Sequence, residues 1–229
     1  MNVFQKDGLK YVDEGKGEMV LFFHGWGLSP YSYKKIINEL SLKYRIIAPF
    51  IDSFRNFQDD EAIIKVLVNK ENIKKIIVIG HSAGGAPAVN FSSDLSDRIR
   101  TLILVDSVGA IKNSSILQWK TNWIKHGLGI VIHPSRLSVV LIKDFLSQII
   151  NPRKLLREGE FALNKNLEFK PKFPVLILWG EQDDLIPIEN GYNLQKLIQG
   201  SKFISVKGGH YWFLNKPQLF FQEMERFIN

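Results

Sequence analysis

The residues of this sequence that could do chemistry centre on a serine between two glycines, in the run GHSAG at residues 80–84. The pattern G-x-S-x-G is short enough to arise by chance, so its surroundings decide what it means. It directly follows an apolar run at residues 76–79 and opens a helix-like stretch at residues 83–92. A sharp turn between strand and helix presents the serine hydroxyl, and positions two before and two after must then lack bulky side chains. We interpret Ser82 as a nucleophile; the alternative is a buried serine at a glycine-rich junction.

Two loops farther along the sequence could supply the base and the acid that a serine nucleophile needs. The base removes the hydroxyl proton, and the acid orients the base. Downstream of a serine at such a turn, an acid and then a histidine are expected at the same edge of the sheet. The loop after residues 175–179 carries Asp183 and Asp184, and the loop after residues 202–206 carries His210. Both loops would leave the carboxyl ends of strands, where open α/β sheets bind ligands.

Six short apolar runs predict the sheet that positions these loops. They are apolar without alternation, as expected for strands that are covered on both faces of a parallel sheet. Helix-like stretches alternate with them, which indicates an α/β fold with right-handed crossovers. An antiparallel hairpin, 3–6 and 9–12 joined by Asp7 and Gly8, is predicted to lead into the sheet. The runs are residues 19–23, 44–48, 75–79, 101–105, 175–179 and 202–206, and the helices are 29–42, 61–69, 83–92, 188–197 and 217–228.

An insertion without a convincing strand separates the fourth and fifth runs, and it carries the whole net charge. Of 229 residues, 30 are basic and 23 acidic, which gives a formal charge of +7. Residues 110–172 hold eleven of the basic and four of the acidic residues, and the nineteen of each sign elsewhere cancel. Helices are expected at 116–125, 137–149 and 152–164, with large apolar residues among the charges. A nucleic-acid arm is normally terminal and poor in such residues, so we expect no nucleic-acid partner.

Four motifs together resemble the α/β-hydrolase superfamily, and the resemblance covers nearly the whole chain. Residues 24–27 (HGWG) resemble the family's oxyanion loop and residues 80–84 its nucleophile elbow. Residues 180–187 resemble its acid loop, with the acid at Asp183, and residues 209–210 its histidine loop. The resemblance implies a catalytic triad of Ser82, Asp183 and His210, and an oxyanion hole made by the backbone N–H groups of Trp26 and Ala83.

The acid and the substrate pocket leave alternatives open. Asp106, which ends the fourth apolar run, is the rival acid because some relatives place the acid there; otherwise it caps the first helix of the insertion. The pocket is expected to include Trp26, His81, Trp123 and Trp212, although a tryptophan near a loop is as often plain packing. The histidines show no metal-ligand spacing with carboxylates, so we expect no metal site and no cofactor.

The resemblance also implies an architecture. We expect an α/β-hydrolase fold, a mostly parallel central sheet flanked by helices, with a helical cap inserted before the acid-bearing strand. Residues 1–108 and 172–229 would form the core, and residues 109–171 the cap over the site. The apolar sides of the cap helices would line an acyl pocket, and the basic residues would either keep the cap soluble or face an anionic partner.

The implied activity is that of a carboxylesterase-type serine hydrolase (EC 3.1.1) acting on small to medium acyl esters through an acyl-enzyme. Relatives that open epoxides or displace halide carry aspartate where this chain has Ser82. A second reading is an esterase for methyl esters linked to a carrier protein, because residues 24–28 (HGWGL) also resemble that oxyanion loop. Its acidic carrier protein, or another anionic surface, would dock on the basic cap. A third reading is a non-catalytic ligand-binding protein of the same fold.

The composition of the sequence excludes cysteine chemistry and bears on the compartment in which the protein works. With no cysteine in the sequence, disulfides, thiolate metal sites and a thiol nucleophile are excluded. The start of the chain does not resemble a signal peptide, and no apolar run approaches the roughly 18 residues of a membrane span. We expect a cytoplasmic enzyme without a membrane span, with a small-molecule ester as its substrate.

Overall fold

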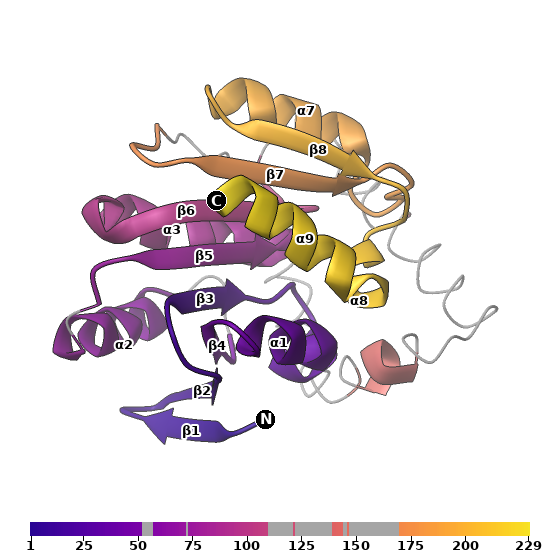
Figure 1. Ribbon diagram of the computed structural model, residues 1–229. Helices are drawn as coiled ribbons and strands as arrows, with labels where there is room; N and C mark the ends of the chain where they lie inside the picture. Colours follow the sequence, from indigo (N-terminus) through magenta and orange to yellow (C-terminus); the bar gives the residue numbers. More distant parts are fainter. Residues whose placement is uncertain (52–56, 72, 110–120, 122–138, 144–145, 147–169) are drawn as a thin grey trace.

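A central sheet of eight strands organises the molecule in the computed structural model, which describes residues 1–51, 57–71, 73–109, 121, 139–143, 146 and 170–229 (Figure 1). The strand order is β1-β2-β4-β3-β5-β6-β7-β8, and pairing from β4 through β8 is parallel. The predicted fold class is confirmed. The strands are β1 (Val3–Lys6), β2 (Leu9–Glu14), β3 (Met19–Phe23), β4 (Arg45–Pro49), β5 (Ile76–His81), β6 (Ile99–Val105), β7 (Val175–Gly180) and β8 (Lys202–Val206).

The predicted hairpin forms the antiparallel margin of this sheet. β1 pairs with β2, and β2 then pairs with β4 rather than with the next strand in sequence. Asp7 and Gly8, at the tip, have φ angles of 49° and 94°. Two consecutive residues with positive φ make the tight turn whose twist matches that of the flanking strands, which explains the Asp-Gly pair.

Helices cover both faces of the sheet and bury two apolar clusters. Alternate residues of β5 show the division, since Ile76 and Val78 face one cluster while Ile77 and Ile79 face the other. The first cluster lies beneath α2, α3 and α7, and the second beneath α1, α8 and α9 (Figure 1). The helices are α1 (Lys34–Ser41), α2 (Phe57–Lys70), α3 (Gly85–Asp94), α7 (Ile188–Leu197), α8 (Trp212–Asn215) and α9 (Pro217–Ile228), with 3₁₀ turns η1 (Pro30–Tyr33), η2 (Ser82–Gly84) and η3 (Ser96–Arg98). Within the described ranges, no helix has the length and apolar character needed to cross a membrane.

The division into core and cap stays a prediction, because most of the insertion lies outside the described residues. Residues 139–143, which are described, are helical. Leu141 among them is buried and belongs to the same apolar cluster as Leu28 and Tyr33. This part of the insertion therefore packs on the face of the sheet that α1, α8 and α9 cover.

Candidate active site

Ser82 stands at the sharpest point of the connection between β5 and α3. Its φ angle is 52°, a left-handed conformation that is rare for any residue but glycine. The strain is held by its surroundings, since the backbone N–H of Val108 donates to the Ser82 carbonyl at 3.1 Å. Ser82 is partly exposed, while its neighbours His81 and Ala83 are buried. The turn thus presents a serine side chain at the carboxyl edge of the sheet.

The two glycines of the motif are required by contact with backbone atoms. A methyl group on Gly84 would lie 2.3 Å from the Phe23 carbonyl oxygen and 2.5 Å from that of His24. One on Gly80 would lie 2.7 Å from Ala88 Cβ and from the Gly84 carbonyl oxygen. These distances are far inside normal contact, so the first turn of the helix packs directly on the strand ends only because both residues lack side chains.

His210 and Asp183 form a buried hydrogen-bonded pair at the same edge of the sheet. His210 Nδ1 lies 2.7 Å from Asp183 Oδ2, and both side chains are almost fully excluded from solvent. The other carboxylate oxygen, Oδ1, accepts from the N–H groups of Leu185 at 2.9 Å and Ile186 at 2.8 Å. A carboxylate can only accept, so the ring donates from Nδ1, and a neutral ring keeps the lone pair of Nε2 available to take a proton.

Two further acids lie near Asp183 in the sequence or in the fold, Asp184 and Asp106, and they differ in their exposure to solvent. Asp184 is exposed, so it is the loop residue that points to solvent. Asp106 is completely buried at the end of β6, has a φ angle of 44°, and accepts from the Gly180 N–H at 2.7 Å. Burial, with the negative charge of Asp183 nearby, raises the pKa of the Asp106 carboxyl well above its usual range. The acid that contacts His210 is therefore Asp183, and Asp106 supports the strand that carries it.

The loop after β3 is held by His24 through both of its ring nitrogens. Nε2 accepts from the Ile51 N–H at 2.9 Å, so in the neutral ring Nδ1 carries the proton and donates to the Gly25 carbonyl oxygen, also at 2.9 Å. In a trans peptide the C=O and the N–H point in opposite directions, so fixing the Gly25 carbonyl also fixes the direction of the Trp26 N–H.

The other expected donor, the Ala83 N–H, belongs to the first turn of η2. Donors in a first turn have no partner within the helix, and the positive end of the α3 dipole lies at the same place. A methyl group on Gly25 would lie 3.2 Å from Ser82 Cβ, so the loop that carries Trp26 packs directly beside the serine. Both backbone donors named from the sequence thus lie on segments that adjoin Ser82.

A chain of hydrogen bonds that the sequence did not predict joins these loops. The Gly25 N–H donates to Tyr33 Oη at 2.9 Å, and Tyr33 Oη lies 2.7 Å from His81 Nδ1. His81 Nε2 lies 3.2 Å from the carbonyl oxygen of His210, and the two imidazole rings are 4.8 Å apart. Tyr33 stands 48 residues before His81, and its position in a helix-like stretch indicates nothing but core packing.

The residues expected to line the pocket lie at different depths. Trp26 is partly buried against the apolar cluster, while Trp123 lies outside the described residues. His81 and Trp212 are buried, and Trp212 packs its ring against Phe213 and Phe220. The structure thus places both side chains below the surface: His81 is the last residue of β5, and Trp212 begins α8, which packs against α9.

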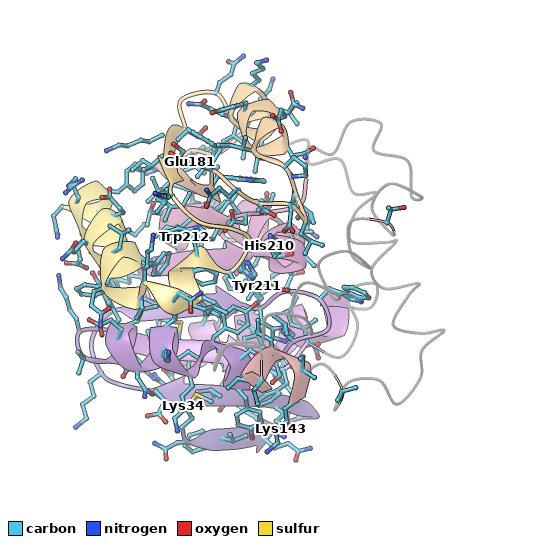
Figure 2. All side chains as sticks on the ribbon, turned by 90° about the vertical axis from the view of Figure 1, so that its right-hand side faces the viewer. Lys34, Lys143, Glu181, His210, Tyr211 and Trp212 are labelled. Carbon is cyan, nitrogen blue, oxygen red and sulfur yellow. The ribbon has the colours of Figure 1, made fainter. Side chains whose placement is uncertain are left out.

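Figure 2 shows this edge of the sheet, seen from the side to which the parallel strands point in Figure 1. His210, Tyr211 and Trp212 follow one another there along the turn that enters α8. The Tyr211 ring stands edge-on to His210, with ring centres 5.0 Å apart. The sequence pattern did not single out Tyr211, which contacts His210. After Tyr33, it is the second aromatic residue of the site that was missed.

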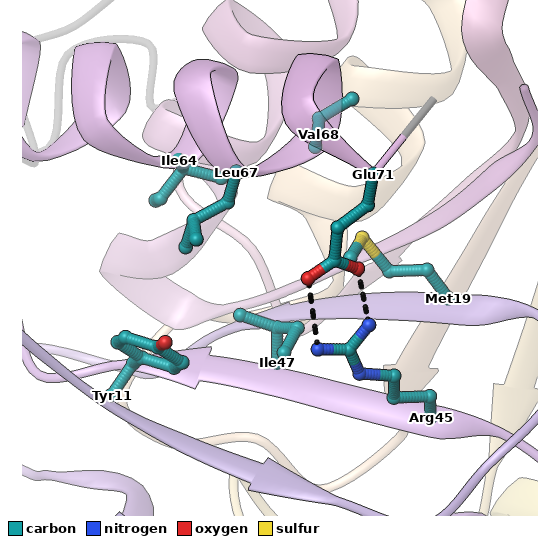
Figure 3. A pocket seen from close by; sticks show the side chains of 8 residues that line it. All are labelled: Tyr11, Met19, Arg45, Ile47, Ile64, Leu67, Val68 and Glu71. Carbon is teal, nitrogen blue, oxygen red and sulfur yellow. Dashed lines mark hydrogen bonds and ion pairs between the residues drawn. The ribbon is translucent and has the colours of Figure 1, made fainter. Parts of the chain in front are cut away.

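A small cavity elsewhere in the molecule does not compete with this site. It lies between α2 and the sheet, with Arg45 paired to Glu71 at its wall (Figure 3). Met19 and Arg45 in its lining begin β3 and β4, so the cavity is at the amino ends of the strands. Its interior of about 10 Å³ has room for one water. Such a space cannot admit an ester substrate.

Comparison with known proteins identifies the family. Residues 20–223 match the alpha/beta hydrolase family, which is most of the chain, and the protein belongs to that family. An uncharacterized hydrolase, YugF, of Bacillus subtilis is 25% identical over 95% of this chain and 92% of its own length. A pimeloyl-[acyl-carrier protein] methyl ester esterase of Aliivibrio salmonicida is 23% identical over 96% of this chain and 95% of its own length.

Solved structures agree on the fold. An esterase from Rhodococcus sp. ECU1013 superposes with a TM-score of 0.75 at 17% identity, covering 99% of this chain and 97% of the other. An esterase from Exiguobacterium antarcticum gives a TM-score of 0.73 at 16% identity, covering 97% of this chain and 96% of the other. The protein is therefore a hydrolase-family chain whose structural neighbours include esterases.

Proposed function

We propose that this protein is a serine carboxyl-ester hydrolase for small to medium acyl esters. The observation that carries the proposal is the buried His210–Asp183 pair, with Nδ1 and Oδ2 2.7 Å apart, at the edge of the sheet where Ser82 stands in a strained turn. A base oriented by a buried acid, at the same sheet edge as a partly exposed serine, is the arrangement that acyl transfer needs. The esterases among the structural neighbours support the same reaction class.

The reaction would proceed through an ester of Ser82. His210 Nε2 takes the hydroxyl proton while Oγ forms a bond to the substrate carbonyl carbon. The negative oxygen meets the N–H groups of Trp26 and Ala83, each worth on the order of 3 kcal/mol of barrier. The C–O bond to the alcohol then breaks, and the alcohol leaves with the proton from His210. His210 then takes a proton from water as the water oxygen bonds to the acyl carbon. The bond from that carbon to Ser82 Oγ breaks, His210 returns the proton to Oγ, and the acid leaves.

Turnover of a chromogenic ester by the wild type and by Ser82→Ala tests this function. With 4-nitrophenyl acetate and butyrate we expect the variant to lose at least about 10⁴-fold in kcat, because no other group can form the acyl-enzyme. Ser93→Ala is the matched control, because Ser93 lies near the carboxyl end of α3, the helix that follows Ser82, and donates to the Val89 carbonyl. Equal rates in wild type and Ser82→Ala would overturn the proposal, and no turnover by either protein would favour a non-catalytic protein of the same fold.

A second candidate is an esterase for esters carried on an acidic carrier protein. Two observations favour it: the similarity to the pimeloyl-[acyl-carrier protein] methyl ester esterase over nearly the full length of both chains, and the charge of +7 within residues 110–172. Both readings share the chemistry at Ser82 and differ in the partner that delivers the ester. The salt dependence of turnover separates them, because attraction between a basic surface and an acidic carrier weakens with salt.

A further inference from the structure

We propose that His81 and Tyr33 are positioning residues, which lock the loop that carries Trp26 to the loop that carries His210. The proposal rests on the proposed function, since it assigns a role in the same site. The proposed roles require no contact with substrate, because both side chains are buried; His81 is the last residue of β5 and directly precedes Ser82.

The direction of every hydrogen bond between Gly25 and His210 follows from the two groups at the ends of the series, the Gly25 N–H and the His210 carbonyl oxygen. The His210 carbonyl oxygen can only accept, so His81 must carry a proton on Nε2. A neutral His81 then has a lone pair on Nδ1, and Tyr33 Oη donates to it. At the other end the Gly25 N–H can only donate, and Tyr33 Oη accepts it. All donors and acceptors are satisfied by a neutral ring protonated on Nε2.

The burial of His81 favours this neutral form. Its side chain is fully buried, and burial, together with the positive charge that His210 can carry, holds the pKa of His81 well below its usual range. Neutrality at His81 also suits the reaction, because the rings of His81 and His210 are 4.8 Å apart and a second positive charge would oppose protonation of His210.

The chain of hydrogen bonds reaches from β5 to the loop after β8, and these two strands are not neighbours in the sheet. Gly25 follows β3 and His81 ends β5, but His210 follows β8, and β6 and β7 lie between β5 and β8. With His24 holding the Gly25 carbonyl and Tyr33 holding the Gly25 N–H, both polar groups of this residue are fixed. The position of Gly25, the residue before Trp26, therefore depends in part on the same chain of hydrogen bonds that reaches the His210 backbone.

A kinetic comparison of Tyr33→Phe, His81→Gln and the double variant tests the connection. Each single change should lower kcat about ten- to a hundredfold, since small misplacements of catalytic groups are costly, and leave KM within about twofold. Because both changes break one chain, the double variant should lose little more than the worse single variant. Tyr44→Phe is the matched control, since it removes a buried tyrosine hydroxyl bonded to Glu225, away from the site; its kcat should stay within about twofold of wild type.

The ring tautomer of His81 is a second readout that needs no ester. In protein labelled with ¹⁵N-histidine, a multiple-bond ¹H–¹⁵N spectrum at pH 7 should show the proton on Nε2, with the resonances assigned by their loss in His81→Gln. A proton on Nδ1, an imidazolium ring, or wild-type kcat in an active Tyr33→Phe enzyme would overturn the proposal. If the wild type hydrolyses no ester, the proposed function fails, and the tautomer still decides the connection.

Discussion

Two buried carboxyl groups lie behind His210, and their surroundings give them different tasks. Asp183 has both oxygens in hydrogen bonds from N–H donors, one of them on the His210 ring. Asp106 accepts from Gly180 in a fully buried position where its pKa is raised, which favours the neutral acid. Only the first can stabilise an imidazolium at His210.

Asparagine substitutions separate the two carboxyl groups. Asp183→Asn should lower kcat by about 10³–10⁴-fold, because an amide cannot hold the required tautomer of His210. Asp106→Asn keeps an oxygen for the Gly180 N–H and resembles the protonated acid, so kcat should stay within about tenfold of wild type. Measured with a chromogenic ester, the reverse order of the two losses would reassign the acid to Asp106.

The lowered pKa of His81 predicts a loss of stability in acid. The unfolded chain binds a proton at His81 near its ordinary pKa of about 6.5, whereas the folded protein resists it, so the contribution is full above that pH and is lost as the pH falls below it. Between pH 6.5 and 5.5 the loss should be on the order of 1 kcal/mol. Urea unfolding of wild type and His81→Gln measures it as the difference between their pH slopes; identical slopes would show that His81 is not held neutral.

At the scale of elements, the bounds of the strands could be predicted closely from the sequence. The hydrogen bonds that join the loop after β3 to the loop after β8 could not be predicted. The runs at 19–23 and 202–206 match β3 and β8, and the helices at 188–197 and 217–228 match α7 and α9. The other four runs gave bounds shifted by one or two residues. α8 was missed because four residues are too short to show helical periodicity.

Within the site, the order of motifs could place Ser82, Asp183 and His210 on loops at one sheet edge, because parallel strands end together. It could not choose between Asp183 and Asp106 from the residues alone, since β6 and β7 are neighbours and both acids follow strand ends. The partnership of Tyr33 with His81 depends on which faces of η1 and β5 meet, and no local pattern records that.

The packing of α3 onto β3 predicts the cost of a methyl group in the elbow. In Gly84→Ala the new Cβ meets the backbone oxygens of Phe23 and His24, which cannot rotate away. We expect a loss of about 1–3 kcal/mol or more in the free energy of unfolding, measured in urea. In the control, Gly209→Ala, the one atom of the described residues that the methyl would meet is the Gln182 carbonyl oxygen, at 3.3 Å, so the change should cost less. Equal losses in the two variants would contradict this account of the elbow.

At the scale of the whole molecule, the net positive charge comes from one segment, residues 110–172. The chain outside residues 110–172 is electrically balanced, and the described basic residues of that segment, Lys143, Lys170 and Lys172, are exposed. The acyl transfer proposed at Ser82 requires no net charge on the protein, so the charge bears on what approaches the site. Long-range attraction between a basic surface and an acidic partner raises association rates and weakens steeply with salt.

This charge predicts how salt distinguishes the two candidate substrates. For an ester on an acidic acyl-carrier protein, kcat/KM should fall about tenfold or more between about 20 and 500 mM NaCl, while that for free 4-nitrophenyl butyrate should change little.

Changing Lys143, Lys170 and Lys172 to Glu should remove most of the low-salt advantage. The control changes Lys74, Lys75 and Lys202 to Glu, which alters the net charge equally but at the amino ends of β5 and β8. A preference for the free ester that does not vary with salt, or equal effects of the two triple variants, would rule out a carrier docked on the basic segment. The segment would then serve to keep an apolar insertion soluble.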